Sequence, residues 1–131
     1  MNNKAVRLTS ACIKTLTKVE VDIKSSHQHE FNGVLQLKEM FGPDKRSFDA
    51  IFSVRGRDIF EIAEVTWYEA RETHPKRSEY RLYFKSNDVM SNASAGDNII
   101  IGFDVSNKLH LILIKKDEPE YKGVVSSWTR L

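Results

Sequence analysis

The feature that most constrains this chain is a series of short β-type segments separated by turn residues. Five such segments, rich in β-branched and aromatic side chains, are residues 47–54, 59–68, 79–85, 98–103 and 108–115. Tight turns are indicated at residues 55–58 and 104–107. No long helical pattern offers a crossover between parallel strands. The sequence therefore predicts a mainly β fold with antiparallel pairing.

Weaker signals complete the expected architecture. Residues 16–24 end in a strict alternation of apolar and charged side chains, which indicates a strand, and residues 124–128 form a further short strand. Short helices are expected at residues 33–41, with Asn32 as N-cap, and near residues 87–92. Six or seven short strands must nearly close to hide their edges. We therefore expect an open antiparallel pseudobarrel of six or seven strands with two short helices.

Length and composition bound the remaining possibilities. The 131 residues, 40% of them hydrophobic, fit one domain over residues 1–131, with its core at about residues 16–115. The single cysteine, Cys12, excludes an intrachain disulfide. No apolar run approaches the ~20 residues of a membrane span, and no secretory signal is visible at the N-terminus. These features favour a cytoplasmic protein with no membrane partner.

Charge is unevenly distributed along the chain. The net charge is only +2, so overall charge does not indicate a polyanionic partner. Residues 71–85, however, hold five basic and two acidic side chains, a net charge of +3. The chain therefore combines one basic segment with an otherwise balanced body.

Within that segment, alternate residues have the chemistry of base recognition. At the period of a strand, Arg77, Glu79 and Arg81 point to the same side. Arginine donates two parallel hydrogen bonds to guanine, and glutamate accepts from cytosine. Lysine and arginine neighbours, namely Arg71, Lys76 and Lys85, suit phosphates. An alternative stays open, in which this is a solvated face and Glu79 pairs with the arginines.

Metal binding is a weaker interpretation of the histidines. His27 and His29 lie two residues apart, and Cys12 or Glu30 would have to complete a ligand shell. The spacings typical of structural zinc sites are missing. His110 falls within a strand pattern, which favours a structural role. We therefore expect no metal and no cofactor.

Catalytic motifs are also incomplete. Asp49, Glu61 and Glu64 are spaced carboxylates, but the lysine that follows such acids in magnesium nucleases is missing. Neither a Gly-x-Ser-x-Gly elbow nor a glycine-rich phosphate loop occurs. The sequence predicts that the isolated domain is not an enzyme, with a metal-dependent hydrolase kept as an alternative.

Aromatic residues suggest another alternative, a barrel that binds single-stranded nucleic acid or oligosaccharide. Such barrels stack bases on exposed aromatic side chains. The candidates are Trp67, Tyr68, Tyr80 and Tyr83. Because they interleave with apolar residues, at least two of the four are expected to be buried.

Two stretches carry a resemblance to a known family. They are SSHQHEFNG at residues 25–33, followed by the expected short helix, and WYEARETHPKRSEYRLY at residues 67–83, followed by AGD at residues 95–97. The chain resembles, over about residues 16–115, the DNA-binding pseudobarrel shared by plant B3 transcription factors and specificity domains of restriction endonucleases. It is most similar to the N-terminal effector domain of EcoRII-type enzymes. The resemblance implies a B3-like pseudobarrel.

The resemblance also implies a function. In that family, two loops grip the major groove, here an N-arm at residues 25–32 and a C-arm at residues 73–81. The chain would recognise a sequence in double-stranded DNA, as the specificity module of a prokaryotic type II restriction endonuclease whose catalytic domain acts in cis or in trans. The implied base-reading residues are Arg77, Glu79, Arg81, His27, Gln28, His29 and Asn32. The implied phosphate contacts are Lys24, Ser25, Ser26, Arg71, Lys76, Tyr80 and Lys85, with Tyr80 in place of a basic residue.

Overall fold

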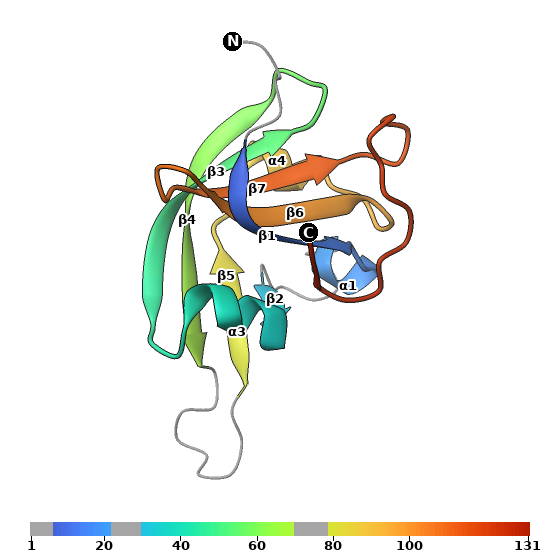
Figure 1. Cartoon of the computed structure of the whole chain (residues 1–131). Helices are drawn as coiled ribbons and strands as arrows, with labels where there is room; N and C mark the ends of the chain where they lie inside the picture. Colours follow the sequence, from blue (N-terminus) through green and yellow to red (C-terminus); the bar gives the residue numbers. More distant parts are fainter. Residues whose placement is uncertain (1–6, 22–29, 70–78) are drawn as a thin grey trace.

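The architecture is a single, strongly curled β-sheet (Figure 1). The computed structural model describes residues 7–21, 30–69 and 79–131. Within them, eight strands follow the order β2-β5-β4-β3-β7-β6-β1-β8 and form an open half-barrel. The strands are β1 (Leu8–Thr15), β2 (Glu30–Gly33), β3 (Arg46–Val54), β4 (Phe60–Glu69), β5 (Tyr80–Phe84), β6 (Asn98–Asp104), β7 (Leu109–Ile114) and β8 (Thr129–Arg130). The mainly β prediction is confirmed, but the described residues hold eight strands rather than six or seven.

One strand pair departs from the expected antiparallel pattern. β3 and β7 run parallel, with Ile51 opposite His110 and Val54 opposite Leu113, whereas the other neighbouring strands among the described residues pair antiparallel. A parallel pair needs a long connection but not one long helix. Here the connection is the whole segment from β4 to β6. The sequence expectation failed because it considered only a helical crossover.

The expected strand at residues 16–24 is wrong for residues 16–21, where a short helix, α1 (Lys18–Val21), forms; residues 22–24 lie outside the described residues. Thr17 and Glu20 form a reciprocal cap: the Glu20 backbone N–H donates to Thr17 Oγ1 at 3.3 Å, and the Thr17 N–H donates to Glu20 Oε1 at 2.9 Å. Lys14 Nζ also donates to Glu20 Oε2 at 2.7 Å. These contacts satisfy the N–H groups that a helix start leaves unpaired, and they outweigh the alternating pattern.

The next helix among the described residues is α3 (Leu35–Phe41), slightly shorter than expected. Its N-cap is Val34 rather than Asn32, because Asn32 lies in β2 and takes part in the pairing with β5. Leu37 and Phe41 form the buried face. Gly42, with φ of +84°, ends the helix in a backbone conformation that favours glycine. The last helix, α4 (Asp88–Ser91), begins at Asn87, whose side chain accepts from Met90 N at 2.9 Å, close to the predicted position.

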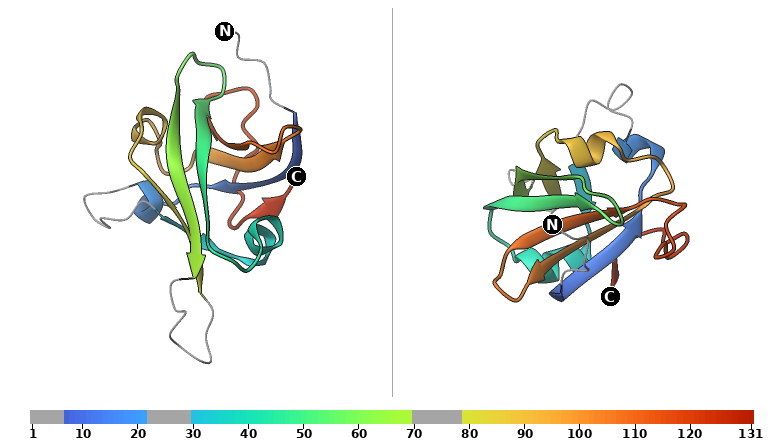
Figure 2. Two further views of the ribbon diagram at one scale, coloured as in Figure 1. Left: turned by 90° about the vertical axis from the view of Figure 1, so that its left-hand side faces the viewer. Right: turned by 90° about the horizontal axis from the view of Figure 1, so that it is seen from above.

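The main core fills the concave side of the curled sheet. Its largest fully buried side chains include Trp67, Phe31, Phe41 and Phe52. Figure 2 shows the long β3–β4 hairpin along one side of the molecule, with α3 beside the end opposite its turn. At that end the Trp67 indole Nε1 donates to the Gly42 carbonyl at 2.8 Å, which fastens α3 to β4. No helix in the described ranges is long and apolar enough to cross a membrane.

The C-terminal residues cover part of the convex side. Ile13, Ile100, Ile112 and Ile114 form a second cluster there, against which Tyr121 and Val125 pack. Every residue of β7 is therefore buried.

The chain end also contributes to the main core. Trp128 is buried in that core, and the short β8 pairs with β1, so no strand forms at residues 124–128. The core thus extends beyond the expected residues 16–115, at both ends of the chain.

The predicted β6–β7 hairpin is confirmed and is organised by Asp104. Its Oδ1 accepts from the backbone N–H groups of Lys108 at 3.0 Å and Ser106 at 2.8 Å, and its Oδ2 lies 2.8 Å from His110 Nε2. His110 is buried, as its structural interpretation predicted. These bonds, that from Lys108 first, hold the pKa of Asp104 below its ordinary value of 3.8.

This lowered pKa predicts an acid dependence of stability. A carboxylate with a depressed folded-state pKa stabilises the fold above its unfolded pKa, and the stabilisation is lost as pH falls through the folded value. The stability advantage of the native chain over Asp104→Asn should therefore be full at pH 7 and shrink below about pH 4. Thermal unfolding followed by circular dichroism from pH 7 to pH 2.5 measures it. A difference that is constant over this range would show that Asp104 titration does not contribute.

Candidate nucleic-acid interface

The candidate site lies on the convex face of the β2-β5-β4 edge. In β5, Tyr80, Leu82 and Phe84 are buried, so the alternate residues Arg81 and Tyr83 point outward. The register places Arg81 opposite Asn32 of β2 and Tyr68 of β4. Because Arg81 and Tyr68 are directly opposite on one face of the sheet, their side chains are close enough to interact. Arg81 is therefore the central residue of this edge.

Two carboxylates hold the Arg81 guanidinium. Its Nε donates to Glu79 Oε2 at 2.9 Å, and its Nη2 is hydrogen-bonded to the same oxygen. Its Nη1 donates to Glu30 Oε1 at 3.3 Å. The hydrogen bonds with Glu79 are the main reason that the pKa of Arg81 lies above its ordinary value. Glu79 and Arg81 thus point to one side, as predicted, and are paired with each other.

Glu30 is itself held by a residue from a third strand. The Tyr68 hydroxyl donates to Glu30 Oε2, the oxygen that Arg81 does not contact. Burial, followed by the hydrogen bond and the charge of Glu30, raises the pKa of Tyr68 to about 12. The phenol is therefore protonated, and a donor, at neutral pH. Tyr68, Glu30, Arg81 and Glu79 form one hydrogen-bonded chain across β4, β2 and the start of β5, called here the Arg81 cluster.

The Arg81 cluster leaves Arg81 able to bind a ligand. A guanidinium has five N–H donors, and the contacts with Glu79 and Glu30 use three of them. Two parallel donors are what recognition of guanine O6 and N7 requires. The side chain of Arg81 is 24% exposed, so it is held in place without being enclosed.

Tyr80, which the resemblance implies as a phosphate contact, is buried rather than exposed. It is only 6% exposed, and its ring stacks on Trp67 with centroids 5.1 Å apart. Its hydroxyl donates to the Pro43 carbonyl at 2.9 Å. The aromatic side chain at this position anchors the start of β5 in the core, which explains how a tyrosine can occupy it.

The other expected contacts divide into two groups. Lys85 is exposed and lies 3.6 Å from Glu64 through its Nζ, so it remains accessible to a phosphate. Asn32 is brought to the Arg81 edge by the register of β2. The remaining expected contacts lie outside the described residues: Lys24, Ser25, Ser26, His27, Gln28, His29, Arg71, Lys76 and Arg77.

The aromatic residues give limited support to a stacking platform. Trp67 and Tyr80 are buried, which confirms that at least two of the four candidates belong to the core. Tyr68 is half-buried, and Tyr83 is 40% exposed. Two aromatic side chains on neighbouring strands are a small surface compared with the aromatic rows that bind successive bases.

The candidate metal ligands do not converge in the described part of the chain. Asp49 and Glu64 are opposite each other on the convex face, but Glu61 points to the other side, where its Oε1 accepts from Asp88 N at 2.7 Å. Cys12 is buried in the core, and burial raises the pKa of its thiol. Residues 7–21, 30–69 and 79–131 contain no group of three or more potential ligands, while His27 and His29 lie outside these ranges.

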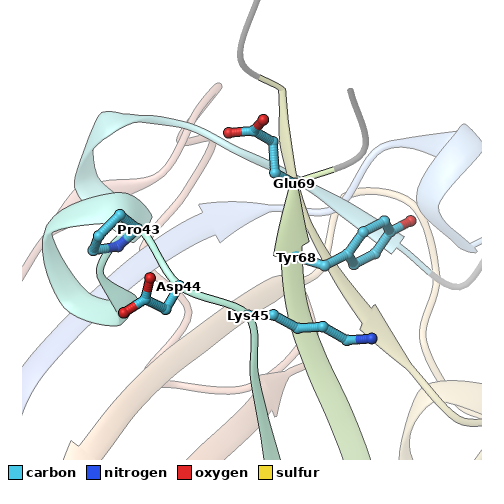
Figure 3. A pocket seen from close by; sticks show the side chains of 5 residues that line it. All are labelled: Pro43, Asp44, Lys45, Tyr68 and Glu69. Carbon is cyan, nitrogen blue, oxygen red and sulfur yellow. The ribbon is translucent and has the colours of Figure 1, made fainter. Parts of the chain in front are cut away.

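A small open pocket of about 310 Å³ lies beside the Arg81 cluster (Figure 3). It is formed between the turn after α3 and the end of β4, and its lining residues are Pro43, Asp44, Lys45, Tyr68 and Glu69. Figure 3 shows Lys45 and Tyr68 extending to the same side, whereas Glu69 points away from them. The charged groups that line it are of both signs, so they select no single class of ligand.

Sequence reasoning missed the roles of Glu30 and Tyr68. They lie 51 and 13 residues before Arg81, and only the pairing of β2 and β4 with β5 brings all three together. Only the prediction of a strand at residues 30–33 could have pointed to these contacts from the sequence. Four residues are too few to show a periodic pattern, so that strand was not predicted. No family model matches the chain, and comparisons with curated proteins and with solved structures find no match either.

Proposed function

We propose that this chain recognises a specific sequence in double-stranded DNA, with Arg81 as a base-reading residue. The observation that carries the proposal is the placement of Arg81. It is half-buried on the convex face, fixed by two carboxylates, and retains donors for a base edge. It also lies where residues 71–77, which supply three of the basic side chains of this segment, join β5.

The order of elements supports the two-loop arrangement that the resemblance implies. Residues 22–29 join α1 to β2, residues 70–79 join β4 to β5, and β2 and β5 are neighbours. We propose a B3-like pseudobarrel in which both segments contact one major groove. The proposed base-reading residues are Arg77, Glu79, Arg81, His27, Gln28, His29 and Asn32. The proposed phosphate contacts are Lys24, Ser25, Ser26, Arg71, Lys76 and Lys85.

Selection of binding sites from random duplexes tests the proposal directly. Purified chain should enrich a short sequence with adjacent G and C pairs, because arginine and glutamate have partners on those bases. Single-stranded competitor should displace the bound duplex poorly. Enrichment of no sequence, or preferential displacement by the single strand, would overturn duplex recognition and favour a single-strand-binding barrel.

We further propose that the chain is the specificity module of a type II restriction endonuclease and does not cut DNA by itself. The cleavage activity would then belong to a catalytic domain in cis or in trans. Incubation of purified chain with the selected duplex and magnesium should leave the DNA intact. Site-specific nicking that disappears on replacement of Asp49 or Glu64 would instead show a hydrolase built on those two carboxylates, which are opposite each other in the sheet.

Binding should weaken steeply as salt increases, because each neutralised phosphate releases counterions. Lys76→Ala and Lys85→Ala should each reduce affinity for all sequences alike. Each should also make the slope of log K against log salt concentration less steep by about 0.9. Titrations at four salt concentrations measure the slope. Lys122→Ala, an exposed lysine in the C-terminal segment, is the matched control and should leave the slope unchanged. An affinity independent of salt would indicate a different class of ligand.

A further inference from the structure

We infer that Glu30 is a specificity-determining residue: by holding Arg81 and opposing its charge, it makes Arg81 favour a base edge over a phosphate. The inference rests on the proposed DNA-binding function and assigns to Glu30 a role beyond it. Glu30 acts through Arg81, so it is a positioning residue. Its contacts come from two strands, β4 and β5.

The first step of the argument is the geometry of the guanidinium. Glu79 takes the edge formed by Nε and Nη2, and Glu30 takes one N–H of Nη1. A flexible arginine would search many orientations and would lose that freedom on binding. An arginine fixed at two sides by carboxylates keeps one N–H on Nη1 and one on Nη2 in a defined position. Such fixed donors suit the planar bidentate contact with guanine.

The second step is charge. Glu30 places a second carboxylate on Arg81, beside that of Glu79. A phosphate has a full negative charge and is repelled by the Glu30 carboxylate, whereas the edge of a base has only partial charges. The carboxylates therefore penalise contact with the phosphate backbone, which is the same in every sequence, more than contact with a base. Discrimination arises from a penalty on the wrong ligand as much as from attraction to the right one.

The third step is that Glu30 cannot easily move aside. Its side chain is only 13% exposed, and its second oxygen accepts from the Tyr68 hydroxyl. Its strand, β2, is paired with β5 at Tyr83, two residues from Arg81. The carboxylate is therefore part of the sheet edge and should keep its place when a ligand approaches.

The test compares Glu30→Gln with Glu120→Gln in the full chain. Glutamine keeps an acceptor and the shape of Glu30 but removes its charge. Glu120 also pairs with an arginine, Arg55, but at the turn of the β3–β4 hairpin, the end opposite the Arg81 cluster, so it is a matched control. Affinities are measured for the selected duplex and for a random duplex at several salt concentrations.

Glu30→Gln should raise affinity for the random duplex roughly three- to tenfold at ~0.1 M salt, steepen the salt slope by up to about 0.9, and lower the ratio of selected to random affinity. Glu120→Gln should change none of these. Equal effects of the two variants, or an unchanged ratio in Glu30→Gln, would overturn the role of Glu30 while leaving DNA recognition intact. A native chain without any preference would instead overturn the proposed function.

Tyr68→Phe provides a second variant if Glu30→Gln fails to fold, which circular dichroism would show. It releases one oxygen of Glu30 without changing the net charge. The preference for the selected duplex should fall while the salt slope remains that of the native chain. An unchanged preference would contradict the requirement that Glu30 be held in place.

Discussion

Replacing Arg81 with alanine is expected to remove discrimination at one base pair of the selected site. A bidentate arginine–guanine contact discriminates by about 1–3 kcal/mol, so discrimination at that position should fall roughly ten- to hundredfold. Overall affinity should fall as well, because Glu30 and Glu79 would then face the DNA without the guanidinium between them. Competition between the selected duplex and its single-base variants measures both effects.

Two further substitutions sharpen this prediction. Arg81→Lys keeps the charge but lacks the planar fork, so it should restore affinity for random DNA without restoring the base preference. Arg55→Ala removes an arginine paired with Glu120 at the opposite end of the β3–β4 hairpin and should leave the preference unchanged. If Arg81→Ala selects the same sequence as the native chain, Arg81 does not read a base.

The second large effect concerns stability. Trp67→Ala is expected to reduce the free energy of unfolding by about 3–5 kcal/mol, the range for deleting a large aromatic side chain from a core. Trp67 is fully buried and stacks on Phe41 and Tyr80 at centroid distances of 5.0 and 5.1 Å. Its loss also removes the hydrogen bond to the Gly42 carbonyl, which joins α3 to β4.

Urea unfolding measures this change. It is followed by far-UV circular dichroism, because the backbone signal remains usable when a tryptophan is removed. Tyr83→Ala, in the adjacent strand but with an exposed ring, is the control and should alter stability by no more than about 0.5 kcal/mol. Because Tyr80 begins β5 and packs on Trp67, the Trp67 variant should also weaken DNA binding. Equal stabilities of the two variants would contradict the assignment of Trp67 to the centre of the core.

Elements with strong local signals were predicted well from the sequence. The hairpins β3–β4 and β6–β7 have long β-rich segments on both sides of short turns, and α4 begins at an asparagine cap. Each of these depends on neighbouring residues, so a local pattern is sufficient to predict it. The prediction for residues 16–24 failed because two local patterns competed there. The cap formed by Thr17 and Glu20 outweighed the alternation.

The candidate site was predictable only in part. Glu79 and Arg81 are two residues apart, so their common orientation follows from the period of a strand. The contact of Arg81 with Glu30 spans 51 residues, and that of Glu30 with Tyr68 spans 38. Such contacts depend on which strands become neighbours, and residues 30–33 gave no periodic signal from which that could be inferred.

The sequence by itself determined the mainly β class, the two hairpins, the position of the basic segment and the orientation of Arg81 relative to Glu79. Only the tertiary structure decided the parallel pairing of β3 with β7, the burial of Tyr80 and the carboxylate of Glu30 beside Arg81. The physical reason is the range of the interactions involved. Periodicity and turn chemistry act over a few residues, whereas strand order is settled by closing the curled sheet around a shared core, and that closure brings Glu30 and Tyr68 to Arg81.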